Sequence, residues 1–184
     1  MGNIKENIIK MKELSELLLD LSYSAVFLHD KKIALQVDQV YDEIKNLEKD
    51  TLRMIFKIRE SENDRLILID LTASIRGVAN ETKKLAELAK SEHPITIIRD
   101  ILTGSSRRII DEVVSEKSAI ANKKIGDSSI RTNTRAHIVC LKRKDKWMFD
   151  VDKETRLLPG DLVVAVGREK AEKKLVELLR GKKQ

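Results

Sequence analysis

Apolar residues in the first half of the chain recur at alternating steps of three and four positions. This spacing places them on one face of a helix. Three segments show it, and their apolar faces are Leu14, Leu18, Leu21, Ala25 and Leu28; Ile33, Val37, Val40, Ile44, Leu47, Thr51, Met54 and Ile58; and Leu68, Leu71, Ile75, Val78, Thr82 and Leu85. The pattern predicts three antiparallel helices packed at shallow angles.

Polar residues mark the ends of these helices. His29-Asp30 interrupts the first apolar pattern, Ser61–Asp64 combines capping and turn residues, and His93-Pro94 ends the third segment. Gly77 lies inside the third predicted helix, where glycine costs about 1 kcal/mol relative to alanine. We therefore expect a neighbouring helix to approach closely there, near Ala73 and Ala79.

Beyond residue 107 the apolar pattern takes the period of strands. The strand-like runs are RIIDEVVSE (108–116), AHIVCLK (136–142), KWMFDV (146–151) and LVVAV (162–166). Residues 169–180 then predict a closing helix with Ala171, Leu175, Leu178 and Leu179 toward the sheet and Gly181 just past its end. The fold class is predicted as α+β: an antiparallel helical bundle over 1–102, a linker over 103–107 and a small β-sheet domain with helices on one face over 108–184.

The sequence Pro159-Gly160-Asp161 precedes the last predicted strand. Pro159 presets φ at the first central position of a type II turn, and Gly160 supplies the positive φ of the second. A phosphate-binding loop would instead place its glycines at the start of a helix. We therefore interpret this segment as a structural turn that leads into a central strand.

Charge is distributed unevenly along the chain. Residues 1–105 hold 16 lysines and arginines against 18 carboxylates, whereas residues 106–184 hold 20 against 12. This asymmetry favours two modules, of which the basic one faces an anionic partner. The single Cys140 excludes an internal disulfide framework, and the absence of a signal segment or a long apolar run predicts a cytoplasmic protein that does not insert into the membrane.

Motifs typical of enzymes are missing. The chain has no GxGxxG, P-loop, HExxH or CxxC motif, so we expect no enzymatic activity. Nucleic acid is also not an expected partner, because basic residues in the second half alternate with acids and Trp147 and Phe149 are predicted on a buried strand face.

Two groups of polar residues are candidate sites. Asp38 and Asp42 share one face of the second helix and are weak candidates for a metal site, with a solvated acidic face as the favoured interpretation. Arg131, Arg135 and His137 surround a polar turn and a strand start, where they can converge on the phosphate of a small anion. The alternative is that both arginines pair with surface acids and that His137 is simply a strand-end residue.

Several segments resemble a known regulatory domain. VVSEKS, KKIGDSSIRTNTRAHIVCLKR and TRLLPGDLVVAVGREKAEKKL resemble the C-terminal regulatory domain of TrkA and of the potassium-conductance regulators (RCK-C). The segment LSELLLDLSYSAVFLHDKKIALQVDQV resembles a PhoU-like helical domain. The resemblance implies a non-enzymatic cytosolic regulator or ligand sensor of potassium or related cation transport, dimeric through its C-terminal domain, whose partner is a membrane transporter or channel subunit.

The same resemblance implies a ligand site. Some relatives bind a cyclic dinucleotide between two copies of this domain, and the corresponding residues are Ile130, Arg131, His137 and Ile138. NAD is not expected, because the nucleotide-binding domain with the glycine fingerprint that precedes this module in TrkA is not present in the chain. The PhoU-like segment supports an alternative function, an accessory regulator of phosphate transport.

Overall fold

A computed structural model describes residues 3–92, 97, 100–101, 104 and 106–181, which belong to two compact units, 1–94 and 95–184. The predicted helix end at His93-Pro94 lies outside the described residues, as does part of the predicted linker 103–107. The limits of the two domains in that region therefore stay a prediction.

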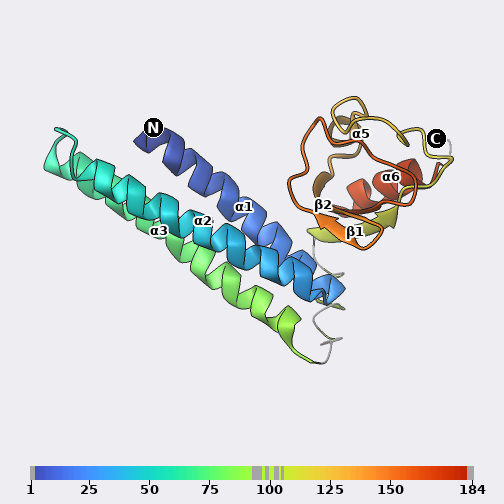
Figure 1. Ribbon diagram of the computed structural model, residues 1–184, viewed down its shortest axis with the longest axis horizontal. Coiled ribbons are helices and arrows are strands. Elements are labelled where there is room, and N and C mark those ends of the chain that lie inside the picture. Colours follow the sequence, from blue (N-terminus) through green and yellow to red (C-terminus); the bar gives the residue numbers. More distant parts are fainter. Residues whose placement is uncertain (1–2, 93–96, 98–99, 102–103, 105, 182–184) are drawn as a thin grey trace. The chain divides into compact units, whose positions relative to one another are not determined.

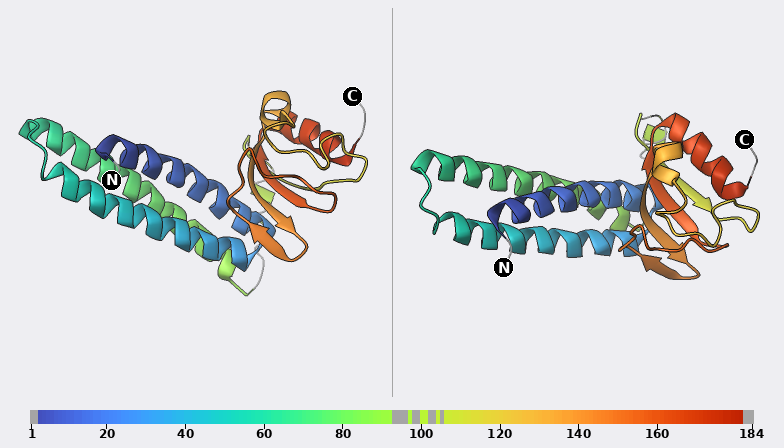
Figure 2. Two further views of the ribbon diagram at one scale, coloured as in Figure 1. Left: turned by 45° about the horizontal axis from the view of Figure 1, so that its top comes forward. Right: turned by 90° about the horizontal axis from the view of Figure 1, so that it is seen from above.

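The first unit is a bundle of three long helices that lie side by side (Figure 1, Figure 2): α1 (Ile4–Leu28), α2 (Lys31–Ile55) and α3 (Glu62–Glu87), followed by the short 3-10 helix η1 (Leu88–Lys90). His29 adopts a left-handed conformation with φ 49°, and the Asp30 side chain accepts hydrogen bonds from the backbone of Lys32 and Ile33. The connection between α1 and α2 is tight because one residue ends the first helix and the next caps the second. The predicted helical bundle is confirmed.

The packing of α3 differs from the expected seam. Thr72, Ala79, Thr82 and Ala86 are its buried residues, whereas Leu71 and Val78 are 45% and 56% exposed. Of the predicted face, Thr82 is buried and Leu68, Ile75 and Leu85 are half-buried, so the contact with α1 and α2 combines these residues with small side chains that the pattern did not include. The expected close approach at Gly77 is wrong, because no atom of a neighbouring helix would lie within 4 Å of a Cβ built there.

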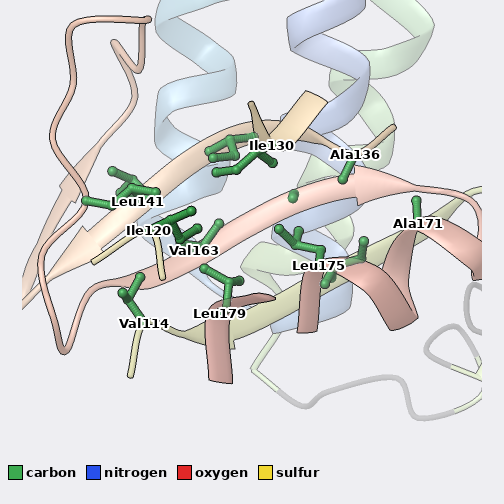
Figure 3. Close-up of a cluster of buried hydrophobic side chains, with 13 residues drawn as sticks. Val114, Ile120, Ile130, Ala136, Leu141, Val163, Ala171, Leu175 and Leu179 are labelled. Carbon is green, nitrogen blue, oxygen red and sulfur yellow. The ribbon is translucent and has the colours of Figure 1, made fainter. Parts of the chain in front are cut away.

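The second unit is a four-stranded antiparallel sheet in the order β1-β4-β2-β3. Its elements are β1 (Arg108–Val113), α5 (Ile130–Thr134), β2 (His137–Arg143), β3 (Lys146–Met148), β4 (Leu162–Gly167) and α6 (Glu169–Arg180). Figure 2 shows α6 along one face of the sheet, and Figure 3 shows the apolar cluster between them, to which Val163, Leu175 and Leu179 contribute. The predicted α+β fold is confirmed.

Two local predictions in this unit have different outcomes. β4 is the central strand expected from its apolar residues, and the turn before it is the predicted one, with Gly160 at φ 86° and the backbone N–H of Asp161 donating to the Leu158 carbonyl. β3 is shorter than predicted and stops at Met148. Phe149 lies beyond the strand, where its ring stacks on that of Trp147 with centroids 6.1 Å apart, and both rings are half-buried.

Within the described parts of the chain, no helix combines the length and the apolar character that crossing a membrane requires.

Candidate functional site

The predicted ligand residues lie around the junction of α5 and β2. Ile130, at the start of α5, is 2% exposed and belongs to the apolar cluster under the sheet. Arg135 ends the helix in a left-handed conformation with φ 63°, and its backbone N–H donates to the carbonyl of Arg131. This reversal of the chain brings His137 to the first position of β2 while α5 stays packed on the core.

Pairing between strands brings the end of β4 to the same place. His137 lies opposite Val166 in the sheet, and Gly167 and Arg168 follow directly in the chain. A Cβ at Gly167 would lie 2.8 Å from the Cβ of Ala171 and 3.5 Å from the Cα of Ala136. Because Gly167 has no side chain, the first turn of α6 packs closely on the start of β2; Figure 3 shows Ala136 and Ala171 toward this end of the cluster.

Four exposed basic side chains belong to this end of the sheet, and we call them the basic rim: Arg131, Arg135, His137 and Arg168. None of the four forms an ion pair or a side-chain hydrogen bond with any residue of the described chain. The alternative in which Arg131 and Arg135 pair with surface acids is therefore not observed. Unpaired guanidinium groups keep all their donors available for a planar or phosphate anion.

Ile130 and Ile138 have a different position from the two polar candidates. They are 2% and 8% exposed, and both belong to the apolar cluster. Their side chains anchor α5 and β2 in the core, which fixes the places of their neighbours Arg131 and His137. Of the four predicted ligand residues, Arg131 and His137 thus belong to the basic rim, and Ile130 and Ile138 lie in the core beneath it.

Arg108 starts β1 at the same end of the sheet, opposite Gly167. Its charge is compensated on α6, because its guanidinium pairs with Glu172 at 3.1 Å and with Glu169 at 3.8 Å. Its Nε is buried without a hydrogen-bond partner. It also lines an open hollow of about 380 Å³ along α6, together with Glu172, Lys173, Val176, Glu177 and Arg180. None of the predicted ligand residues lines this hollow.

Sequence patterns missed two residues of this unit. Arg168 joins the basic rim, and its only sequence signal is its position directly after a strand that ends in glycine. Arg143 lies at the end of β2, one residue beyond the strand predicted over 136–142, where its Nε and a terminal nitrogen donate to the two carboxylate oxygens of Asp161, each at 2.8 Å. These hydrogen bonds to Asp161 raise the pKa of Arg143 and outweigh the effect of burial, so the guanidinium stays charged and the pair is structural.

The two weak candidates for a metal site, Asp38 and Asp42, have different environments. The carboxylate of Asp38 accepts bonds from Lys90 at 2.8 Å and Lys83 at 3.2 Å, while Asp42 is exposed. Burial alone would raise the pKa of Asp38, but the two lysines outweigh it and hold the pKa below its usual value. Asp38 therefore ties α2 to α3, and no group of three or more potential metal ligands occurs among the described residues.

Comparison with protein families matches residues 109–180 to the TrkA-C domain. The second unit is therefore a TrkA-C domain, as the resemblance implied. The helical unit is consistent with the PhoU-like expectation in being an all-helical bundle, although the family match does not extend to it. No curated protein sequence matches the chain.

Three solved structures are similar to the chain at low identity. The RCK_C domain dimer of S. agalactiae BusR in complex with c-di-AMP is 22% identical, with 42% of this chain and 96% of that chain covered and a TM-score of 0.39. The RCK C domain of the potassium transport protein KtrA, with cyclic diadenosine monophosphate, is 18% identical over 45% and 94% of the two chains, with a TM-score of 0.37. S. agalactiae BusR with its busAB-promotor DNA is 14% identical over 92% and 97%, with a TM-score of 0.38.

Two of the expectations stay predictions. The first is that nucleic acid is not a partner. The prediction that NAD is not bound stays untested, and the GsuK channel, 17% identical over 64% of this chain and 21% of that chain with a TM-score of 0.39, was solved with NAD.

Proposed function

We propose that this chain is a regulatory subunit of a membrane cation transporter and that its TrkA-C domain senses a small phosphate-bearing ligand. The observation that carries the proposal is the basic rim, four exposed and unpaired basic side chains at one end of the sheet of a TrkA-C domain. Arg131 and His137 supply the phosphate contacts, with Arg135 and Arg168 beside them. Ile130 and Ile138 hold this geometry from the core.

The ligand site is proposed to form between two copies of the domain, as the family resemblance implies. An anion between two basic rims removes the repulsion of like charges that otherwise opposes their approach. Binding then favours the paired arrangement, because the ligand has a higher affinity for paired domains than for separate ones. The transporter partner responds to this change in arrangement.

Titration calorimetry on the full chain tests this ligand site. Cyclic diadenosine monophosphate and ATP are the probes, because they differ in shape while both carry phosphate. Arg131→Ala is expected to weaken binding of the favoured probe about tenfold or more, through the loss of charged hydrogen bonds to phosphate. Lys174→Ala is the matched control, since Lys174 is an exposed and unpaired cation on α6 outside the basic rim. Equal losses in both variants, or no binding by either probe, would contradict the sensor proposal.

Copurification identifies the class of transporter. A tagged chain expressed in its own cells is expected to retain a potassium or related cation transporter. The PhoU-like bundle keeps a second function open, accessory regulation of phosphate transport, and recovery of a phosphate transporter instead would replace the cation proposal with it.

A further inference from the structure

Helix α3 exposes several large apolar side chains along one side of the helix. Ile67, Leu71 and Val78 are 58%, 45% and 56% exposed, and Leu88 just beyond the helix is 40% exposed. Ser74, Glu81 and Leu85 complete the alternating steps of three and four from residue 67 to residue 88. This is the spacing by which a helix packs along a second helix. We call residues 67, 71, 74, 78, 81, 85 and 88 the α3 stripe.

Gly77 flanks the α3 stripe and has no explanation within a single chain. It lies in the middle of α3, is exposed, and would have no neighbouring atom within 4 Å of an added Cβ. Glycine at such a position costs about 1 kcal/mol of helix stability relative to alanine. A second backbone could approach this position closely from outside the bundle, because glycine has no side chain to keep it away.

We infer that a second copy of this chain covers the α3 stripe, with the two α3 helices antiparallel and a two-fold axis beside Gly77. Charges near the stripe are self-complementary in this arrangement. Asp70 and Lys84 lie seven residues before and seven residues after Gly77. Antiparallel helices centred on Gly77 therefore place each Asp70 beside Lys84 of the second copy, and the two pairs are related by the axis.

The apolar positions agree with nearly the same register. With the two-fold axis beside residues 76 and 77, heptad contact brings Ile67 close to the level of Leu85 of the second copy and Ser74 close to the level of Val78 of the second copy. A parallel arrangement would instead place Glu81 against Glu81 and Asp70 close to its own equivalent, which like-charge repulsion opposes. The charge pattern thus selects the antiparallel pairing.

Sedimentation equilibrium of the full chain without nucleotide tests whether the α3 stripe associates. Val78→Glu introduces a charge at the stripe and is expected to weaken self-association about tenfold or more, seen as a lower average mass at a given concentration. Ala73→Glu is the matched control, because Ala73 is also an exposed α3 residue but lies outside the stripe. Circular dichroism checks that both variants keep their helices.

Charge reversal tests the direction of the pairing. Asp70→Lys and Lys84→Asp are each expected to weaken association, by about threefold, and the double variant to restore it because the opposite charges face each other again. Lys84 also pairs with Glu81 in its own helix, but that pair is 66% and 70% exposed and contributes little. A double variant no better than either single variant would overturn the antiparallel register.

Other occupants of the stripe give different results. If Val78→Glu leaves the average mass unchanged, the second copy is not the occupant and the inference is overturned. A lower unfolding temperature of that variant at unchanged mass would then indicate that apolar residues of the same chain cover the stripe. Ile97 and Ile101, both 64% exposed, would be the candidates. Failure of nucleotide binding at Arg131 would leave this result unaffected, since the association is measured without nucleotide.

Discussion

Asp161 combines the backbone geometry of a turn with a buried ion pair. It is 1% exposed, and its carboxylate accepts from the Leu158 backbone at 2.8 Å as well as from two nitrogens of Arg143. Its bond to the turn is of a local kind, because aspartate side chains in turns commonly bond to nearby backbone. Its pairing with Arg143 is not local, since Arg143 lies 18 residues away in sequence and the contact depends on how β2 and β4 pair.

Replacement of this carboxylate tests the ion pair. Asp161→Asn is expected to lower the free energy of unfolding of the TrkA-C domain by roughly 3 kcal/mol, because it leaves the guanidinium of Arg143 without its counter-charge. Urea unfolding followed by tryptophan fluorescence reports on this domain through Trp147, the single tryptophan. Asp145→Asn, in the exposed turn between β2 and β3, is the control and should leave the midpoint unchanged.

Glycines at two positions are expected to respond in opposite directions. Gly167→Ala is expected to lower stability by about 2 kcal/mol, because its methyl would lie 2.8 Å from the Cβ of Ala171 and push α6 away from the sheet. Gly77→Ala has free space around it and should stabilise a single chain's bundle by up to about 1 kcal/mol. Denaturant midpoints at low protein concentration measure both. A loss at Gly77 of similar size would show that its surroundings in one chain are not open.

Helices α2 and α3 are joined by a polar network as well as by apolar packing. Arg76 lies over the ring of Tyr41, with its guanidinium carbon 4.1 Å from the centroid, and pairs with Glu48 at 3.2 Å. Asp38 on α2 accepts from Lys83 on α3 and from Lys90 just after it. The network stabilises the register between the two helices, because a shift of either helix along the other would separate these paired groups.

The Asp38 pair makes the stability of the bundle depend on acid. Its pKa is lowered in the folded chain, so its contribution is present above the usual carboxyl value of 3.8 and is lost as the pH falls through the lowered value. Asp38→Asn is expected to cost about 1 kcal/mol at neutral pH and progressively less below that range. Thermal unfolding followed by the circular dichroism of the helices measures this. Asp42→Asn, exposed on the same helix, should behave like the unchanged chain at every pH.

Periodicity predicted the helices well because their large apolar residues repeat without interruption. It was only partly right for the contact face of α3, where Thr72, Ala79 and Ala86 are buried and Leu71 and Val78 are not. A count of apolar positions gives little weight to alanine and threonine, although their small size lets three helices come together. For the strand 146–151 the alternation continued past the end of β3, because Phe149 packs on Trp147 without strand pairing.

At the scale of the whole chain, charge separates the two halves. The second half carries the excess of basic residues, and the basic rim belongs to it. Arg131 and His137, two members of the basic rim, could be singled out from the sequence, because polar and basic residues interrupt an apolar pattern at a turn. Arg168 could not, since its place beside them follows from the pairing of β4 with β2, which connects residues 29 positions apart in the chain.

The charge of the second half predicts how ligand binding depends on salt. Affinity for cyclic diadenosine monophosphate is expected to fall several-fold when NaCl rises from about 0.05 M to about 0.5 M, because screening weakens attraction between phosphate and the basic rim. Calorimetry at the two concentrations measures the change. The uncharged nucleoside adenosine serves as the control ligand, and affinity that does not respond to salt would show that the charge of the phosphate does not drive binding.

The order of strands in the sheet also governs how the chain folds during synthesis. Each helix of the bundle packs on partners that precede it or follow a short turn, so the bundle can form as soon as α3 has been made. β1 has its partner in β4, with Arg108 paired to Gly167 and Val113 to Leu162. Until β4 has been synthesised, the nascent chain therefore carries a finished bundle and a strand with an unpaired edge, the kind of exposed edge that chaperones protect from aggregation.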